Sequence, residues 1–153
     1  MLERRYKVRL LGSFIALAFL MVGRANAAGD LMLNTKLEET IAKVRTEKSL
    51  MARTEAAERL AELTRGSNPK SVDDKTVADM VSLLDSPDDS VRAWVAAALG
   101  HLGRRAKLAV PKLLALLPEA DCLQGDLTSA ASIRPALRRM GVKPPPVKTQ
   151  GCN

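Results

Sequence analysis

The sequence predicts an all-α protein in which about three antiparallel helix pairs stack into a short α-solenoid. Three observations support this prediction. After residue 30, apolar residues recur at helical spacing, and no segment shows the period of two that a half-buried strand requires. Trp94 is the only aromatic residue beyond residue 27, and a core of small and aliphatic residues suits closely packed helices. The helical segments also repeat with a period just under 40 residues.

The first 27 residues have the pattern of a secretory signal peptide. Residues 1–9 are basic, residues 10–22 form an apolar run, and Ala25-Asn26-Ala27 fits an A-x-A cleavage site. The run has 13 residues, whereas about 20 are needed to span a bilayer. We therefore expect cleavage after Ala27 and a periplasmic or secreted protein. The alternative is an inner-membrane anchor formed by an uncleaved N-terminal segment.

Removing this segment changes the charge argument. The whole chain carries a net charge of +7, but residues 28–153 hold 19 basic and 16 acidic residues, a net charge of +3. Much of the basicity is thus a targeting device, and a nucleic-acid partner is not expected. We expect contact with a membrane only transiently, through the signal peptide.

The repeat domain is expected over residues 28–141, with its first helix pair at about 34–65. Thr35 to Glu38 matches a capping box, which predicts the start of the first helix. Residues 51–65 are rich in Ala, Leu, Glu and Arg and form the second helix, which Gly66 ends.

The second pair is expected at about 72–103. Thr76 to Asp85 is its short first helix, with apolar residues on one side. Ser86 is then expected as the N-cap and Pro87 as the first residue of a helix that ends at Gly103.

The third pair is expected at about 106–141. Val110 to Leu117 is its first helix, stopped by Pro118, and Ser129 to Met140 is its second. Residues 142–153 contain three consecutive prolines and are expected as an extended tail.

Sequence shifts support this division. A shift of 39 residues places Leu60 on Leu99, and a shift of 38 places Leu99 on Leu137. Three such units are about the minimum that buries a continuous core.

Residues 76–117 resemble a known family. A short helix ending in Leu-Leu is followed by an acidic turn, a Val-Arg pair, an Ala-rich helix, the motif Leu-Gly-x-Leu-Gly and a further Val-Pro-x-Leu-Leu. This order is similar to that of a HEAT repeat and the start of the next one. The resemblance is weaker over 51–65 and weakest over 126–141. It implies an α-solenoid whose second helices line a concave side, and a binding protein rather than an enzyme.

Arg53 and Arg92 occupy equivalent places just after the turns of two repeats. The family pattern implies that they are structural arginines that pair with turn acids along the stack. The usual acid lies one place early, at Asp85, so Asp88 or Asp89 is expected to substitute for it.

Trp94 and His101 are the candidate partner-binding residues. They are seven residues apart and therefore lie two turns apart on one side of the same helix. The equivalent positions of the other repeats include Glu55, Glu62 and Arg139, which we add to the candidate surface. In this interpretation Trp94 anchors a partner. The alternative is that Trp94 fills a gap between adjacent repeats and that His101 is simply solvated.

Cys122 and Cys152 are the two cysteines of the chain. In an oxidising compartment a disulfide between them is expected, and it would hold the proline-rich tail over the last repeat. The alternative is an intermolecular bridge or two free thiols.

No catalytic, cofactor-binding or metal-binding residues are expected. His101 is the only histidine, too few for the usual zinc sites, and no nucleophile–base pair or phosphate-binding glycine loop is recognisable. The sequence therefore predicts an exported, non-catalytic scaffold that binds a protein partner in the bacterial cell envelope, without a cofactor. The alternatives are a non-catalytic accessory or regulatory subunit of an envelope enzyme, and a small enzyme that uses Asp and Glu.

Overall fold

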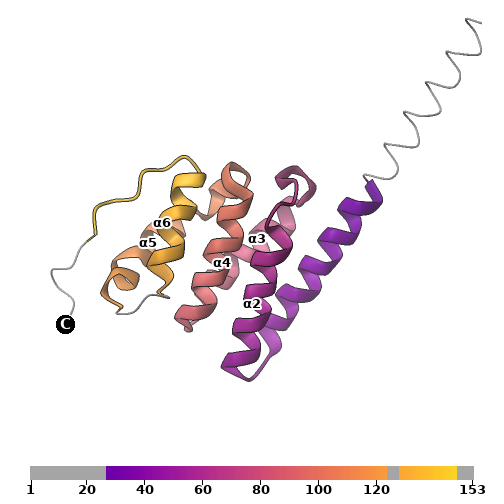
Figure 1. The fold of residues 1–153 in the computed structure, drawn as a ribbon. Coiled ribbons are helices and arrows are strands. Elements are labelled where there is room, and N and C mark those ends of the chain that lie inside the picture. Colours follow the sequence, from indigo (N-terminus) through magenta and orange to yellow (C-terminus); the bar gives the residue numbers. More distant parts are fainter. Residues whose placement is uncertain (1–26, 124–127, 148–153) are drawn as a thin grey trace, which may run out of the picture. The chain divides into compact units, whose positions relative to one another are not determined.

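The computed structural model describes residues 27–123 and 128–147 (Figure 1). Every regular element within these ranges is a helix, and none is a strand, which confirms the all-α class. A first helix covers residues 27–46. The remaining elements are α2 (Leu50–Thr64), η1 (Pro69–Ser71), α3 (Asp74–Ser82), η2 (Leu83–Asp85), α4 (Asp89–Leu102), η3 (Gly103–Ala109), α5 (Val110–Cys122) and α6 (Ser129–Arg139).

The chain divides into two compact units, residues 1–32 and residues 33–153. The described part of the first unit is the helical segment 27–32, which exposes the side chains of Leu31 and Met32. Within the described residues, no helix is both long and apolar enough to cross a bilayer. The apolar run at 10–22 and most of the expected cleavage site lie outside the described residues, so the signal peptide stays a prediction.

Within the second unit, α2, α4 and α6 lie in one row, and α4 packs against both of the others (Figure 1). The helix that ends at residue 46 lies beside α3, because Arg45 forms an ion pair with Asp79 across the two, with an Nη2–Oδ1 distance of 2.8 Å. Further along the chain, α3 contacts α4 and α5 contacts α6. Both α4 and α6 are therefore backed by a second helix, and α2 lines a groove together with the helix that precedes it.

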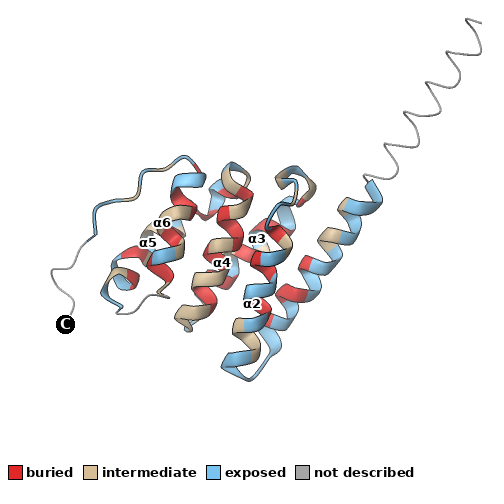
Figure 2. Cartoon of the chain, viewed as in Figure 1, coloured by how far each residue is buried: buried red, intermediate tan, exposed pale blue. Residues whose placement is uncertain are grey.

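The core lies between these two sets of helices (Figure 2). On α4 the buried side follows the helical period, and the four residues that the spacing places in the core are all at most 1% exposed: Val91, Val95, Leu99 and Leu102. Gly100 lies where α4 meets α6, since a Cβ atom there would be 2.9 Å from the Cβ of Ala136. The absence of a side chain at Gly100 thus allows the close approach of these two helices.

The expected start of the first helix was wrong. Thr35 and Glu38 lie inside the helix that covers residues 27–46, so they do not form a cap. The motif is local and can also occur within a helix, whereas the residues upstream decide where the helix begins. Residues 28–33 include Ala28, Leu31 and Leu33, which are good helix formers.

The start of α4 was also placed too early. Its N-cap is Asp88 rather than Ser86, and Pro87 precedes the helix. The Ser86 hydroxyl oxygen instead accepts a hydrogen bond from the Asp88 N–H at 3.2 Å, which closes the turn before the helix.

Pro118 does not end α5, which continues to Cys122. A proline inside a helix removes one backbone hydrogen bond and costs roughly 3 kcal/mol. Here Pro118 itself is exposed, while Leu117 and Ala120 on either side of it are buried. We attribute the continuation of the helix to the burial of these two residues.

Candidate functional site

Trp94 lies on the side of α4 that faces α2. Two contacts define this side: the hydroxyl groups of Ser90 and Thr54 are 2.9 Å apart, and the His101 ring contacts the carboxyl end of α2. Positions 90, 94 and 101 fall within about 40° of one another around a helix, so Trp94 shares this side. The Trp94 side chain is half-buried and packs against the hydrophobic core. It therefore contributes to packing and still presents part of its surface.

His101 joins α4 to the end of α2. Its Nδ1 is 3.0 Å from the Ala61 carbonyl oxygen and 3.3 Å from the Thr64 hydroxyl oxygen. Burial lowers the pKa of His101, and the positive charges of Arg139 and Arg65 lower it further, while the Ala61 hydrogen bond acts in the opposite direction. His101 is therefore not simply solvated.

Three arginines lie at the carboxyl ends of the three helices of the row. Arg65 directly follows α2, Arg104 follows α4, and Arg139 is the last residue of α6. All three are exposed, and none forms an ion pair with a carboxylate within the described part of the chain. We call Arg65, Arg104 and Arg139 the carboxyl-end arginine cluster.

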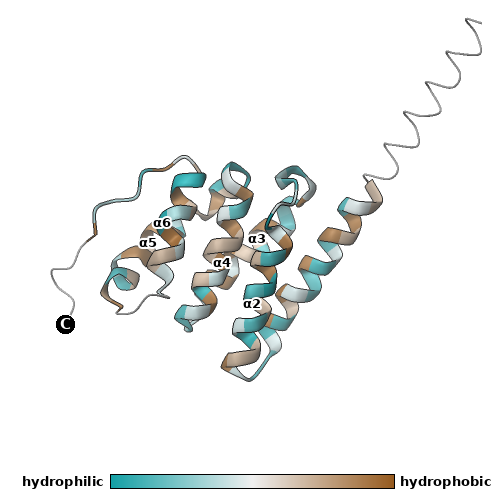
Figure 3. Cartoon of the chain, in the orientation of Figure 1, coloured by the Kyte–Doolittle hydropathy of each residue, from teal (hydrophilic) through white to brown (hydrophobic). Residues whose placement is uncertain are grey.

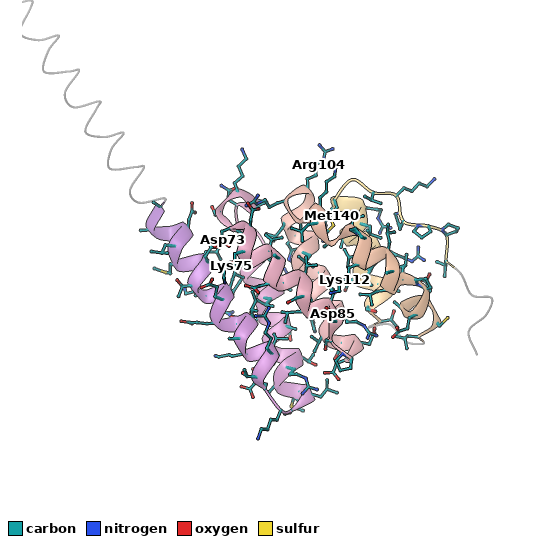
Figure 4. The ribbon with its side chains drawn as sticks, turned by 180° about the vertical axis from the view of Figure 1, so that it is seen from behind. Asp73, Lys75, Asp85, Arg104, Lys112 and Met140 are labelled. Atoms are coloured by element: carbon teal, nitrogen blue, oxygen red, sulfur yellow. The ribbon has the colours of Figure 1, made fainter. Side chains whose placement is uncertain are left out.

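Two members of this cluster lie near His101, and the third lies beside the turn that follows α6. Both Arg65 and Arg139 act on the pKa of His101 through their charges. Arg139 Nη1 is 3.6 Å from the point where a Cβ of Gly100 would lie, and Arg104 Nε is 3.8 Å from that of Gly141. Figure 4 shows Arg104 pointing away from the helices, near Met140. Hydrophilic residues dominate the upper ends of α4 and α6 (Figure 3).

Each helix of the row is followed by a glycine with a positive φ. The φ angles are 76° for Gly66, 56° for Gly103 and 85° for Gly141, a region that L side chains rarely adopt. Gly66 directly follows Arg65 and Gly103 directly precedes Arg104, and Gly141 lies two residues after Arg139.

Arg53 is held by an acid of the next helix. Its Nη2 is 2.7 Å from Oδ2 of Asp88, and its Nη1 donates hydrogen bonds to the carbonyl oxygens of Glu47 and Lys48. The contact ties α2 and the preceding turn to the start of α4.

Arg92 is buried and connects α4 to α5. Its Nη2 donates to Oδ1 of Asp89 at 3.1 Å and to Oε1 of Glu119 at 3.0 Å, and its Nη1 donates to the Ser86 carbonyl oxygen. Asp89 in turn accepts a hydrogen bond from the Ser129 N–H at the start of α6. Asp88 and Asp89 are the two acids that the sequence offered as substitutes.

Glu55 and Glu62 line a different surface. Both are exposed, and Glu62 forms an ion pair with Arg59 at 2.7 Å. They border a groove of about 590 Å³ whose lining comes from the first helix, the turn that follows it and α2: Thr40, Lys43, Glu47, Ala52, Glu55, Ala56, Glu58, Arg59 and Glu62. Neither α4 nor α6 contributes to this groove. The five candidate residues thus do not share one groove, whereas His101 and Arg139 do lie together.

The sequence interpretation did not include Arg65 and Arg104. A signal was present, because the shift of 39 residues that aligns the repeats also places Arg65 on Arg104. Arg139 aligns with His101 instead, so only the packing of the three helices brings all three arginines together.

The proposed disulfide involves one described residue. Cys122 is the last residue of α5, and Cys152 lies outside the described residues. The pairing therefore stays a prediction. In the part of the chain that the structure describes, no group of three or more His, Cys, Asp and Glu residues could hold a metal ion.

No model of a protein family matches this chain, and neither a curated protein nor a solved structure is found to be similar. Over the described residues, the structure defines an all-helical protein in which α4 packs against both α2 and α6.

Proposed function

We propose that this protein is a short HEAT-like solenoid, exported to the bacterial cell envelope, that binds a protein partner without a cofactor and without catalysing a reaction. The observation that carries the proposal is the serial packing of α4 between α2 and α6. Solenoid proteins bury their core through such contacts between neighbouring repeats and use the remaining surface for binding.

The arginine–acid contacts give further support. Arg53 pairs with an acid at the start of α4, and Arg92 binds acids of its own helix and of α5. Equivalent arginines thus stabilise successive turns, as expected for a repeated structural unit.

Export is tested by the intact mass of the protein recovered after expression of the full chain in a bacterium. The expected product begins at Ala28 and is found in the periplasmic fraction. A product that begins at Met1 and stays in the membrane fraction would instead assign the uncleaved anchor.

Partner binding is tested by crosslinking in the periplasm followed by purification through a histidine-free tag. The expected result is a partner at fixed stoichiometry that a matched, unrelated periplasmic protein does not capture. A stoichiometric enzyme whose activity requires this chain would assign the accessory-subunit role. Recovery of no specific partner would contradict the proposal.

A further inference from the structure

The arginines of this protein fall into two groups. Six form ion pairs with described carboxylates: Arg45, Arg53, Arg59, Arg92, Arg105 and Arg134. Among the described residues, Arg65, Arg104, Arg138 and Arg139 form none. Three of these four are the carboxyl-end arginine cluster. Among the described arginines, those without an ion pair are therefore concentrated at one end of the helix row.

A role in stabilising helices does not explain this concentration. A cation near the carboxyl end of a helix interacts favourably with the helix dipole, and this holds for each arginine taken alone. Placing three of them at one end of the helix row, two of them near His101, adds mutual repulsion, which an ion pair with a carboxylate would relieve. No described carboxylate supplies that relief, although acidic residues pair with arginines elsewhere in the fold.

We propose that the carboxyl-end arginine cluster binds an acidic segment of a protein partner. The inference rests on the proposed binding function and names its site. Guanidinium groups pair with carboxylates through two parallel hydrogen bonds, which makes arginine well suited to recognise Asp and Glu. Trp94 lies two turns before His101 on the same side of α4 and keeps part of its surface exposed.

The geometry also indicates how the acids of such a segment are spaced. Packed helices lie roughly 8–10 Å apart. An extended polyproline II chain rises about 3.1 Å per residue with three residues per turn, so acids three residues apart lie on the same side and about 9 Å apart. One carboxylate for each of α2, α4 and α6 therefore corresponds to acids at every third position of an extended segment.

The chain contains its own reporter for this site. His101 is the only histidine, so a single imidazole signal is expected in an NMR spectrum of the untagged or histidine-free-tagged protein. The positive charges of Arg65 and Arg139 lower the pKa of His101. A bound carboxylate offsets these charges, so its binding raises that pKa.

The test titrates the purified protein with the peptide Glu-Ser-Gly-Glu-Ser-Gly-Glu and follows His101 by NMR across a range of pH. The control peptide replaces each Glu with Gln. We expect binding of the acidic peptide only, with a rise in the pKa of His101 and weaker binding at higher salt. Equal binding of both peptides, or an unchanged His101 titration at saturating acidic peptide, would overturn the proposal.

Matched variants locate the site. Arg65→Gln, Arg104→Gln and Arg139→Gln are each expected to weaken peptide binding at least fivefold while the thermal unfolding midpoint stays within a few degrees. Arg138→Gln removes the same charge from the neighbouring exposed position and is expected to leave binding within twofold. An equal loss in Arg138→Gln and Arg139→Gln would show general charge attraction and contradict a defined site.

Two further experiments test whether the site binds lipid instead of peptide, and whether the site and the scaffold function fail separately. Vesicles of anionic phospholipid that bind in an Arg139-dependent way, with no peptide binding, would assign a lipid headgroup and overturn the proposal. The triple Gln variant should lose the crosslinked partner. If it retains that partner, the cluster is not the binding site, although the scaffold function stands. If the wild type captures no partner but binds the peptide, the site stands and the scaffold function fails.

Discussion

At the scale of single residues, His101 couples protonation to the packing of α4 on α2. Its contact with the Ala61 carbonyl oxygen requires a hydrogen on Nδ1, which the neutral ring can provide. Burial and the charges of Arg139 and Arg65 disfavour a second proton on the ring. The folded state therefore prefers the neutral imidazole, and its pKa lies below the ordinary value of 6.5.

This pKa shift predicts a pH dependence of stability. Between the ordinary pKa and the lowered one, the unfolded state binds more protons than the folded state, so acidification favours unfolding. The contribution of His101 is fully present above pH 6.5, is lost progressively as the pH falls toward its folded pKa, and levels off below that pKa. His101→Gln removes this component, so the difference in urea-unfolding free energy between wild type and variant should change between pH 7.5 and 5. A difference that stays constant over this range would contradict the prediction.

Gly100 gives a second prediction at this scale. Alanine is favoured over glycine inside a helix by roughly 1 kcal/mol, but a Cβ atom here would lie 2.9 Å from Cβ and 3.0 Å from Cα of Ala136. Forcing α4 and α6 apart typically costs about 1–3 kcal/mol. Gly100→Ala should therefore lower the free energy of unfolding, measured in urea. Gly29→Ala is the control, because a Cβ atom added at Gly29 would have no neighbouring atom within 4 Å, and this variant should not destabilise the protein. A stabilised Gly100→Ala variant would show that the helix interface adapts freely.

At the scale of elements, Arg92 and Arg59 contrast a buried ion pair with an exposed one. The side chain of Arg92 is 9% exposed and bridges α4 and α5, whereas that of Arg59 is 61% exposed. Loss of Arg92 leaves the partly buried Ser86 carbonyl oxygen and part of Asp89 without a donor, so Arg92→Ala should cost about 1–3 kcal/mol of unfolding free energy. Arg59→Ala should change it by no more than about 0.5 kcal/mol. Similar losses in the two variants, measured by urea unfolding, would disprove this assignment.

The helices also show which features of the fold could be predicted. The stripe from Val91 to Leu102 follows from spacing alone, because burial of one face imposes the helical period on the sequence. Helix ends were less predictable: Thr35 lies within a helix, and Pro118 is accommodated within α5. These ends depend on flanking residues and on burial against other helices, which a local motif does not contain.

The candidate site was predictable only in part. Trp94 and His101 stood out because their repeat equivalents are polar, and His101 does lie among charged neighbours from two other helices. Arg65 and Arg104 looked like ordinary surface charges next to glycines. Arg65 and Arg104 become candidate binding residues only because no described carboxylate pairs with them once the helices are packed. That property belongs to the three-dimensional arrangement and not to the sequence.

At the scale of the whole molecule, the end of the second unit is organised by one side chain. Arg134 of α6 forms an ion pair with the buried Asp121 of α5 at 2.6 Å, and its Nη1 donates a hydrogen bond to the Pro145 carbonyl oxygen at 2.7 Å. Arg134 thereby holds the chain at Pro145 close to the end of α5, where Cys122 follows Asp121. Six residues lie between Pro145 and Cys152 along the sequence.

This arrangement favours the intramolecular disulfide over a bridge between two molecules, because Arg134 links Pro145 to Asp121, the residue that precedes Cys122. A loop of 29 residues closed by such a bond stabilises the fold by about 3–4 kcal/mol in the chain-entropy description. Cys152→Ser should therefore lower the unfolding free energy by up to this amount, and the double variant Cys122→Ser/Cys152→Ser should lower it little further, because the same single bond is removed in both.

Arg134→Ala, which removes the contact with Pro145, should slow formation of the bond after reduction. Non-reducing mass spectrometry of the exported protein measures the bond directly. Two free thiols, or a covalent dimer, would show that the tail does not close on its own repeat.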